Sequence, residues 1–172
     1  MKIFGIVGWK NNGKTTLMTR LIRVLTERGY RVSTIKHAHH AFDVDKPGKD
    51  SHRHREAGAA EVLVSSGARW ALMHELRGEE EPGLDELLPR LAPVDILLVE
   101  GFKTHAHPKI EVVLKGSGNP LIAESDSDVV AVASNDPALK VPAGRPLLPL
   151  DEPEVVADFI LERVGLTAGV PS

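Results

Sequence analysis

The sequence predicts an α/β fold in which a mostly parallel sheet is flanked by helices and carries an antiparallel hairpin extension. Two observations support this class. A β-branched apolar run at residues 2–7 leads through a glycine-bounded loop into an amphipathic helical pattern, and further apolar runs alternate with helical patterns along the chain. In addition, the strand-like runs 61–66 and 69–76 are separated only by Gly67 and Ala68, which is the spacing of a hairpin.

The chain begins with a pattern of strand, helix and strand. Residues 2–7 form the first predicted strand, which ends at Gly8. Between Lys14 and Gly29, apolar residues recur at spacings of three and four, as in a helix that buries one face. Residues 31–36 form the second predicted strand. Because a helix separates the two strands, we expect them to be parallel neighbours joined by a right-handed crossover.

The remaining elements follow in the same alternating manner. The polar segment 37–50 predicts a long loop, and residues 51–58 predict a short helix. After the hairpin and a charged link at 77–83, the pattern gives a helix with Leu84, Leu87, Leu88 and Leu91, strands at 94–99, 109–114 and 129–133, and a closing helix at 152–164 with Val155, Val156, Phe159, Ile160 and Val164 on its buried face. We predict one domain over residues 1–166 and a flexible tail at 167–172.

The composition indicates an ordinary globular protein. Of 172 residues, 42% are hydrophobic and 26% charged, and the formal net charge is −3, which disfavours a nucleic-acid-coating role. The absence of cysteine excludes disulfides, thiolate zinc sites and cysteine nucleophiles. No apolar run reaches the roughly 20 residues that span a bilayer, and the N-terminal run has no cleavage-site pattern, so we expect a cytoplasmic protein.

The sequence from Gly8 to Thr15 matches the phosphate-loop pattern G-x-x-x-x-G-K-[ST] and lies between a predicted strand and a helix. In such a loop, backbone N–H groups curl around a phosphate, the lysine reaches the terminal phosphates, and the Ser/Thr hydroxyl ligates Mg²⁺. The predicted fold is therefore P-loop NTPase-like. The predicted nucleotide-binding residues here are Gly8, Asn11, Asn12, Gly13, Lys14, Thr15 and Thr16.

Glu100 ends the apolar run 94–99, at the edge of the sheet where open α/β sheets bind ligands. A carboxylate at this place suits the magnesium region of a phosphate-loop protein. Asp95 lies at the opposite end of the run and is expected to mark the start of the strand. The alternative for Glu100 is a strand-end carboxylate that faces solvent.

The polar loop 37–50 follows the second strand, so we expect it to overhang the phosphate site. Asp45 and Asp50 are candidates for contacts with magnesium or the attacking water, and Lys46 and Lys49 for contacts with an anion. A solvated loop without a specific role is the alternative. A cluster of imidazoles also gives a transition-metal hypothesis, with the candidate ligands His37, His39, His40, His52 and His54.

Asn135 and Asp136 follow the buried run 129–133. A carboxylate at such a position accepts hydrogen bonds from the two donors of a guanine edge, so both residues are candidate base-binding residues. The complete N-K-x-D pattern is absent, and Asn-Asp-Pro is equally suited to a plain turn.

Several segments together resemble the molybdopterin-guanine dinucleotide biosynthesis adapter family, MobB. The most specific is the His-x-His-His run with Asp-Val-Asp-Lys-Pro-Gly-Lys-Asp-Ser at 43–51; the others are residues 8–16, 57–59, 69–72 and 98–103. The resemblance implies a dimeric GTP-binding protein with weak GTPase activity, which assists the guanylyltransferase that joins GMP to molybdopterin. Molybdopterin itself is a further candidate ligand.

Carried over by position, the resemblance implies phosphate binding by Gly13, Lys14 and Thr15, magnesium ligation by Thr15, a place for Glu100 in the magnesium region, and a switch-like loop that contains Asp45. We assign catalytic roles to Lys14, Asp45 and Glu100, and magnesium contacts to Thr15, Asp45 and Glu100. Some related dimeric nucleotidases have a lysine directly after the first glycine of the loop. Trp9 occupies that position here, so no cross-subunit role is assigned to Lys10. We expect slow hydrolysis, because no residue is an obvious strong general base.

Two other functions remain open at this point. A small-molecule kinase would use the same phosphate loop, although the link at 77–83 is short for a lid. A GTP-driven metal-delivery protein would use the histidine cluster. The apolar hairpin strand with Trp70, Leu72 and Met73 is expected to be covered by homodimerisation.

Overall fold

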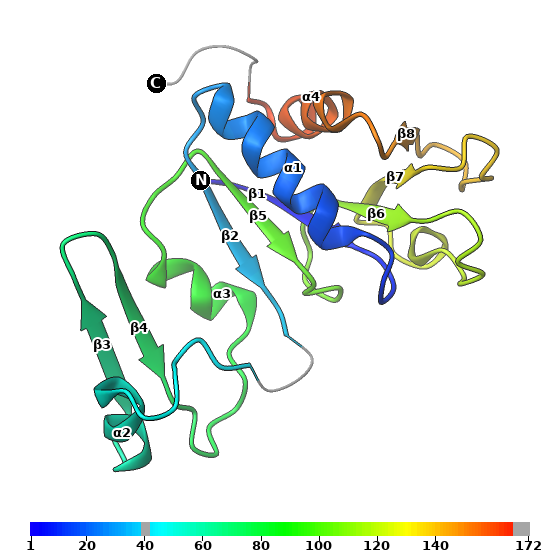
Figure 1. The fold of residues 1–172 in the computed structure, drawn as a ribbon. Coiled ribbons are helices and arrows are strands. Elements are labelled where there is room, and N and C mark those ends of the chain that lie inside the picture. The colour runs from blue at the N-terminus through cyan, green and yellow to red at the C-terminus, as the bar shows by residue number, and fades with distance from the viewer. Residues whose placement is uncertain (39–41, 167–172) are drawn as a thin grey trace. The chain divides into compact units, whose positions relative to one another are not determined.

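A computed structural model describes residues 1–38 and 42–166 (Figure 1). The predicted tail at 167–172 and the histidines at positions 39 and 40 lie outside the described residues. The described chain divides into two compact units, residues 1–37 with 90–166, and residue 38 with 42–89. The prediction of one domain over residues 1–166 stays a prediction, and each unit is described by itself.

The first unit contains a six-stranded sheet with the order β2-β5-β1-β6-β7-β8, in which all neighbouring strands are parallel. Its strands are β1 (Lys2–Val7), β2 (Val32–Lys36), β5 (Ile96–Glu100), β6 (Lys109–Val113), β7 (Val129–Ser134) and β8 (Leu147–Pro149). Its helices are α1 (Lys14–Glu27), α4 (Pro153–Val164) and the 3-10 turn η2 (Ile122–Glu124). The predicted parallel α/β class is confirmed.

The strand order corrects one prediction. β1 and β2 are not neighbours, because β5 lies between them and pairs with both. The burial of the strands explains this order. Every residue of β5 is buried, whereas β2 has no fully buried residue and lies at the edge. The most apolar strand buries the most hydrophobic surface when it has a neighbouring strand on each side, and this burial stabilises the fold.

The core lies between the sheet and the helices α1 and α4, which cover the same face (Figure 1). Phe4 and Ile6 of β1 point into this core, together with Leu21 of α1 and Ile160 of α4. Alternate residues point to the opposite face, where Val7 packs with Ala123 of η2. Val155 was predicted on the buried face of α4 but is 39% exposed, because the buried stripe runs through Val156, Ala157, Ile160 and Leu161.

The second unit contains α2 (Asp50–Glu56), the strands β3 (Glu61–Ser65) and β4 (Trp70–His74), and the short α3 (Leu84–Leu87). A 3-10 turn, η1 (Leu88–Arg90), follows α3, and its last residue belongs to the first unit. β3 and β4 form the predicted antiparallel hairpin. Among the described residues it is a separate two-stranded sheet and adds no strand to the parallel one.

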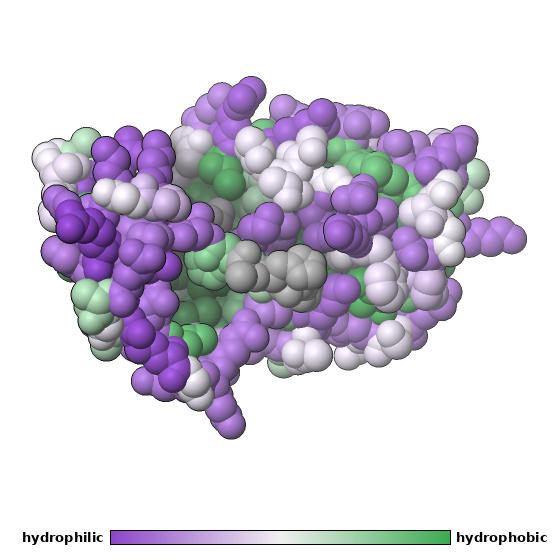
Figure 2. Space-filling model, turned by 60° about the horizontal axis from the view of Figure 1, so that its bottom comes forward, coloured by the Kyte–Doolittle hydropathy of each residue, from purple (hydrophilic) through white to green (hydrophobic). Residues whose placement is uncertain are grey.

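The surface agrees with the composition. Hydrophilic residues predominate on the face drawn in Figure 2, and hydrophobic residues appear there in smaller groups. Within the described ranges, no helix is long and apolar enough to cross a membrane.

Candidate functional site

The phosphate-loop sequence forms the connection between β1 and α1, as predicted. Gly8, Asn11 and Gly13 have positive φ angles of 147°, 65° and 81°. A Cβ atom on Gly8 would lie 2.6 Å from the backbone oxygen of Val112 in β6, so only glycine fits where the loop leaves the sheet. The spacing of the two glycines therefore sets a tight loop, which ends at the N-terminus of a 14-residue helix.

Lys14 lies at the start of α1, and its Nζ donates to the backbone oxygen of Trp9 within the loop, at 2.8 Å. Partial burial, which disfavours the charged form, lowers the pKa of Lys14 below its ordinary value. Nearby Glu100 opposes this shift, while the ammonium groups of Lys103 and Lys36 add to it. The loop thus holds a cation among other cations, an arrangement that favours an anionic ligand.

The structure brings together Thr15 and Glu100, two of the residues predicted for magnesium. The Thr15 hydroxyl donates to the Glu100 carboxylate, with Oγ1 at 3.2 Å and 3.4 Å from its two oxygens. β5 pairs directly with β1, and this pairing places Glu100 beside the phosphate loop. The carboxylate is largely buried, which excludes the alternative of a freely solvated strand end. Hydroxyl and carboxylate oxygens are the donors that Mg²⁺ prefers, so the residues fit this ion.

Lys36 is a site residue that the sequence analysis did not single out. It ends β2 in register with Glu100, and its Nζ lies 3.4 Å from Oε1 of that carboxylate. The position of Lys36 at the carboxyl end of a parallel strand is a signal that sequence reasoning had available. The assumption that β2 lies beside β1 hid its relation to Glu100.

Trp9 connects the phosphate loop to two neighbouring loops. Its indole Nε1 donates to the backbone oxygen of Pro120 at 2.8 Å. Lys103, in the loop after β5, places its Nζ 4.7 Å from the centre of a Trp9 ring. These contacts tie three loops together at one edge of the sheet.

The two candidate base-binding residues have different environments. The Asn135 side chain accepts a hydrogen bond from the Lys115 backbone N–H at 2.8 Å, so it holds the loop after β6. Asp136 accepts from the Ala138 N–H at 3.1 Å, which is a turn contact, but it also lines a cavity of about 330 Å³. That cavity lies between the loops after β6 and β7, and Lys115 and Lys140 line it as well.

Asp45 belongs to the second unit, so its predicted place at the phosphate site stays a prediction. Within that unit its carboxylate accepts from the Lys46 N–H at 2.9 Å, the Ser51 hydroxyl at 2.8 Å and Arg55 Nη1 at 3.5 Å. Burial raises the pKa of Asp45, but these hydrogen bonds outweigh it, and the pKa lies below its ordinary value. Asp45 is therefore an ionised residue that organises its own loop.

The histidine cluster divides between the units. The His37 ring lies 4.9 Å from that of Phe102, and the backbone N–H of His37 donates to the backbone oxygen of Glu100. His52 lies in α2, beside Glu56 at 3.3 Å. Across the described ranges, no three His, Asp or Glu side chains are grouped to hold a metal ion. The candidate ligands at positions 39 and 40 lie outside those ranges.

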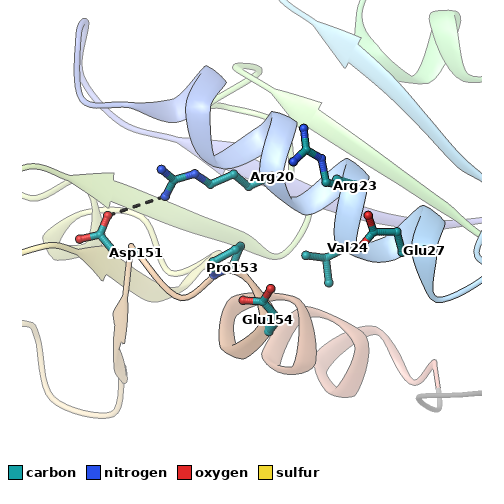
Figure 3. Close-up of a pocket in the computed structure, with 7 residues that line it drawn as sticks. All are labelled: Arg20, Arg23, Val24, Glu27, Asp151, Pro153 and Glu154. Carbon is teal, nitrogen blue, oxygen red and sulfur yellow. Dashed lines mark ion pairs between the residues drawn. The ribbon is translucent and has the colours of Figure 1, made fainter.

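A second cavity, of about 420 Å³, lies between α1 and the start of α4 (Figure 3). Arg20 and Asp151 pair across it, with Nη1 and Oδ1 3.7 Å apart. Val24 is its apolar lining residue on α1, and Arg23, Glu27 and Glu154 add charges of both signs. It contains none of the predicted site residues.

The parallel sheet, the loop between β1 and α1, and the adjacent Thr15 and Glu100 define an α/β protein of the phosphate-loop class. The chain belongs to the family described as molybdopterin guanine dinucleotide synthesis protein B, MobB, whose model matches residues 3–135. The resemblance found in the sequence is thereby confirmed.

Individual relatives agree with this assignment. The chain is 44% identical over 163 residues to the molybdopterin-guanine dinucleotide biosynthesis adapter protein of Escherichia coli K12, covering 93% of this chain and 91% of that protein. Identity to the protein of the same name from Haemophilus influenzae is 42%, covering 92% and 86% of the two chains. The crystal structure of Bacillus subtilis MobB matches with a TM-score of 0.73 at 26% identity, covering 95% of this chain and 98% of that one.

Proposed function

We propose that this chain is a cytoplasmic GTP-binding adapter that assists a guanylyltransferase in joining GMP to molybdopterin. The observation that carries the proposal is the contact between Thr15 and Glu100 beside the phosphate loop. It occurs in a chain 44% identical to a protein named as an adapter of this biosynthesis. The family supports the biosynthetic role, and the residues of the site support a ligand that consists of a phosphate chain with a metal ion.

In this proposal the backbone N–H groups of the loop and the first turn of α1 hold the phosphates. The Lys14 ammonium group would leave the backbone oxygen of Trp9 and donate instead to the terminal phosphates of GTP. The buried side-chain nitrogen of Asn12 has no hydrogen-bond partner among the described residues, and a bound nucleotide is one source of that partner.

Thr15 and Glu100 would hold Mg²⁺, with Asp45 proposed as a further contact. When bound, the ion neutralises charge on the β- and γ-phosphates. Glu100 is already engaged by Thr15 and Lys36, so it is poorly placed to act as a strong general base. Slow GTP hydrolysis follows from this arrangement, and a partner protein would supply groups that raise the rate.

We further propose that the chain forms a homodimer through its hairpin. Leu63 and Trp70 are 61% and 66% exposed, and Val64 and Leu72 are also exposed. A two-stranded sheet with exposed apolar side chains and unpaired strand edges is a surface that a second copy covers favourably.

The test of the adapter role is a reconstituted reaction of guanylyltransferase, molybdopterin, Mg²⁺ and GTP. Formation of the guanine dinucleotide is measured with and without this protein. We expect the wild-type protein to raise the rate and Lys14→Ala to abolish that increase. An equal rate with and without the wild-type protein would contradict the adapter role. Transfer of the γ-phosphate to molybdopterin would indicate a kinase instead.

A further inference from the structure

Lys36 and Glu100 form an ion pair at the rim of the phosphate site. Their register on β2 and β5 brings Nζ to 3.4 Å from Oε1. The two side chains differ in freedom, since that of Lys36 is 58% exposed and that of Glu100 only 11%. Glu100 is therefore the fixed member of the pair, and Lys36 is the member that can change its partner.

The same carboxylate accepts the Thr15 hydroxyl. Glu100 thus joins two partners, an oxygen suited to Mg²⁺ and an ammonium group that already balances its charge. A largely buried carboxylate without a counter-charge is costly, and Lys36 supplies that counter-charge to Glu100. A divalent ion bound by Thr15 and Glu100 would repel the Lys36 ammonium group, because two positive charges at one carboxylate repel each other strongly.

Once the Lys36 ammonium group has left Glu100, the phosphate chain of the nucleotide is an anion that it can bind. Lys36 pairs with the carboxylate that also contacts Thr15, the residue that follows Lys14 in the phosphate loop, so both lysines lie beside this loop. The charge of Lys36 also acts on Lys14. A lysine has a flexible four-carbon stem that allows this movement without any change in the backbone.

We propose that Lys36 is a second phosphate-site lysine, which balances Glu100 in the nucleotide-free protein and moves to the terminal phosphate when Mg²⁺ and a nucleoside triphosphate bind. This inference rests on the proposed function. It adds a residue that distinguishes a triphosphate from a diphosphate, because a diphosphate lacks the group that Lys36 would contact.

The test compares the dissociation constants of guanylyl imidodiphosphate and GDP by calorimetry in the presence of Mg²⁺. Lys36→Met keeps most of the stem and removes the charge. We expect it to weaken binding of the triphosphate analogue about tenfold or more, the usual size of a lost charged hydrogen bond. Binding of GDP should change by less than about threefold, and Lys36→Arg should restore the preference for the triphosphate.

Lys103→Met is the matched control. Lys103 also acts on the charge of Lys14, but its ammonium lies over the Trp9 ring instead of beside Glu100. We expect this variant to change both affinities by the same small factor. A loss of triphosphate preference as large as in Lys36→Met would show a general charge effect and would overturn the specific role of Lys36.

A magnesium titration with GDP tests the exchange directly. In Lys36→Met the Mg²⁺ concentration at half-saturation should fall, because no ammonium must leave Glu100. An unchanged requirement, or equal weakening of both nucleotides, would overturn the proposal. If the wild-type protein binds neither nucleotide, the proposed function itself fails, which is a distinct outcome.

Discussion

Thr15 and Glu100 are 85 residues apart in the sequence, yet the Thr15 hydroxyl oxygen lies 3.2 Å from a Glu100 carboxylate oxygen. The contact arises from the sheet. β5 pairs with β1 so that Glu100 lies opposite Ile6, two residues before the phosphate loop begins. The first turn of α1 then brings Thr15 back over the same edge. A strand pairing therefore creates an oxygen pair suited to Mg²⁺.

Removing the charge of Glu100 should uncouple nucleotide binding from magnesium. In Glu100→Gln we expect most of the gain in GTP affinity caused by Mg²⁺ to disappear, a loss of about 1.5–3 kcal/mol for a charged contact. The affinity measured in EDTA should not fall below that of the wild type, because the substitution removes a negative charge beside the phosphates and releases Lys36. Asp95→Asn, just before the same strand and bonded to Arg31, is the control and should keep the magnesium effect. A full magnesium effect in Glu100→Gln would contradict the assignment.

Lys14→Ala should abolish nucleotide binding and leave the fold intact. The Lys14 side chain bonds to a carbonyl of its own loop and contributes no apolar group to the core, so its loss removes charge rather than packing. Calorimetry with GTP measures the first effect, and far-UV circular dichroism with thermal unfolding measures the second. Lys10→Ala, an exposed lysine of the same loop, should bind GTP nearly as well as the wild type. Wild-type affinity in Lys14→Ala would contradict the phosphate-loop interpretation.

Asp136 and Asn135 should have separable effects. We expect the wild type to prefer GTP to ATP, and Asp136→Ala to reduce this preference, because Asp136 lines the cavity beside the loop after β6. Asn135→Ala should instead lower the free energy of unfolding by about 1 kcal/mol, since its side chain accepts the Lys115 N–H. Competition binding with GTP and ATP measures the nucleotide preference, and denaturant unfolding measures the stability. Equal affinity of the wild type for GTP and ATP would contradict the base-binding role.

The sequence predicted the elements well where one periodicity dominates. The runs that became β1, β5 and α1 were found with nearly their observed bounds. The strand order was not predictable from neighbours along the chain, because the burial of β5 between β2 and β1 decides it. β8 was missed because its three residues end in a proline, and its pairing with β7 defines it as a strand.

The places of Lys14 and Thr15 were predictable from the phosphate-loop pattern, and the place of Glu100 from its position at a strand end. The role of Lys36 could not be predicted, because it depends on the register between β2 and β5, which no local sequence pattern contains. The contacts of Trp9 could not be predicted either, because Pro120 and Lys103 belong to loops that are distant in the sequence. The environments of Asn135 and Asp136 differ through backbone contacts that spacing alone does not reveal.

The exposed hairpin gives a prediction about assembly. We expect the wild-type protein to be a dimer at micromolar concentration and Trp70→Asp to be a monomer, because a charge on the exposed apolar strand opposes its burial against a second copy. Size-exclusion chromatography with light scattering measures the mass. Val155→Asp changes an exposed apolar residue of α4 in the same way and should remain a dimer. A monomeric wild type, or a dimeric Trp70→Asp, would rule out this surface.

The hairpin also contains a group that should make stability depend on pH. His74 Nδ1 lies 2.8 Å from Glu61 Oε1, and Nε2 lies 3.4 Å from Glu79 Oε2. These hydrogen bonds raise the pKa of His74 above its ordinary 6.5. A raised pKa in the folded state means that the folded protein holds the proton more tightly than the unfolded chain. The stabilisation is therefore complete below pH 6.5 and disappears as the pH rises through the higher pKa of the folded state.

His74→Gln provides the comparison, because it keeps a polar side chain and removes the titration. We expect the wild-type midpoint of thermal unfolding to exceed that of His74→Gln most at about pH 5 and the difference to shrink toward about pH 9. Glu61→Gln should reduce the same difference, since it removes the nearer carboxylate charge. A difference between the two midpoints that stays constant across this range would mean that His74 stabilises the hairpin by packing alone, without the proton.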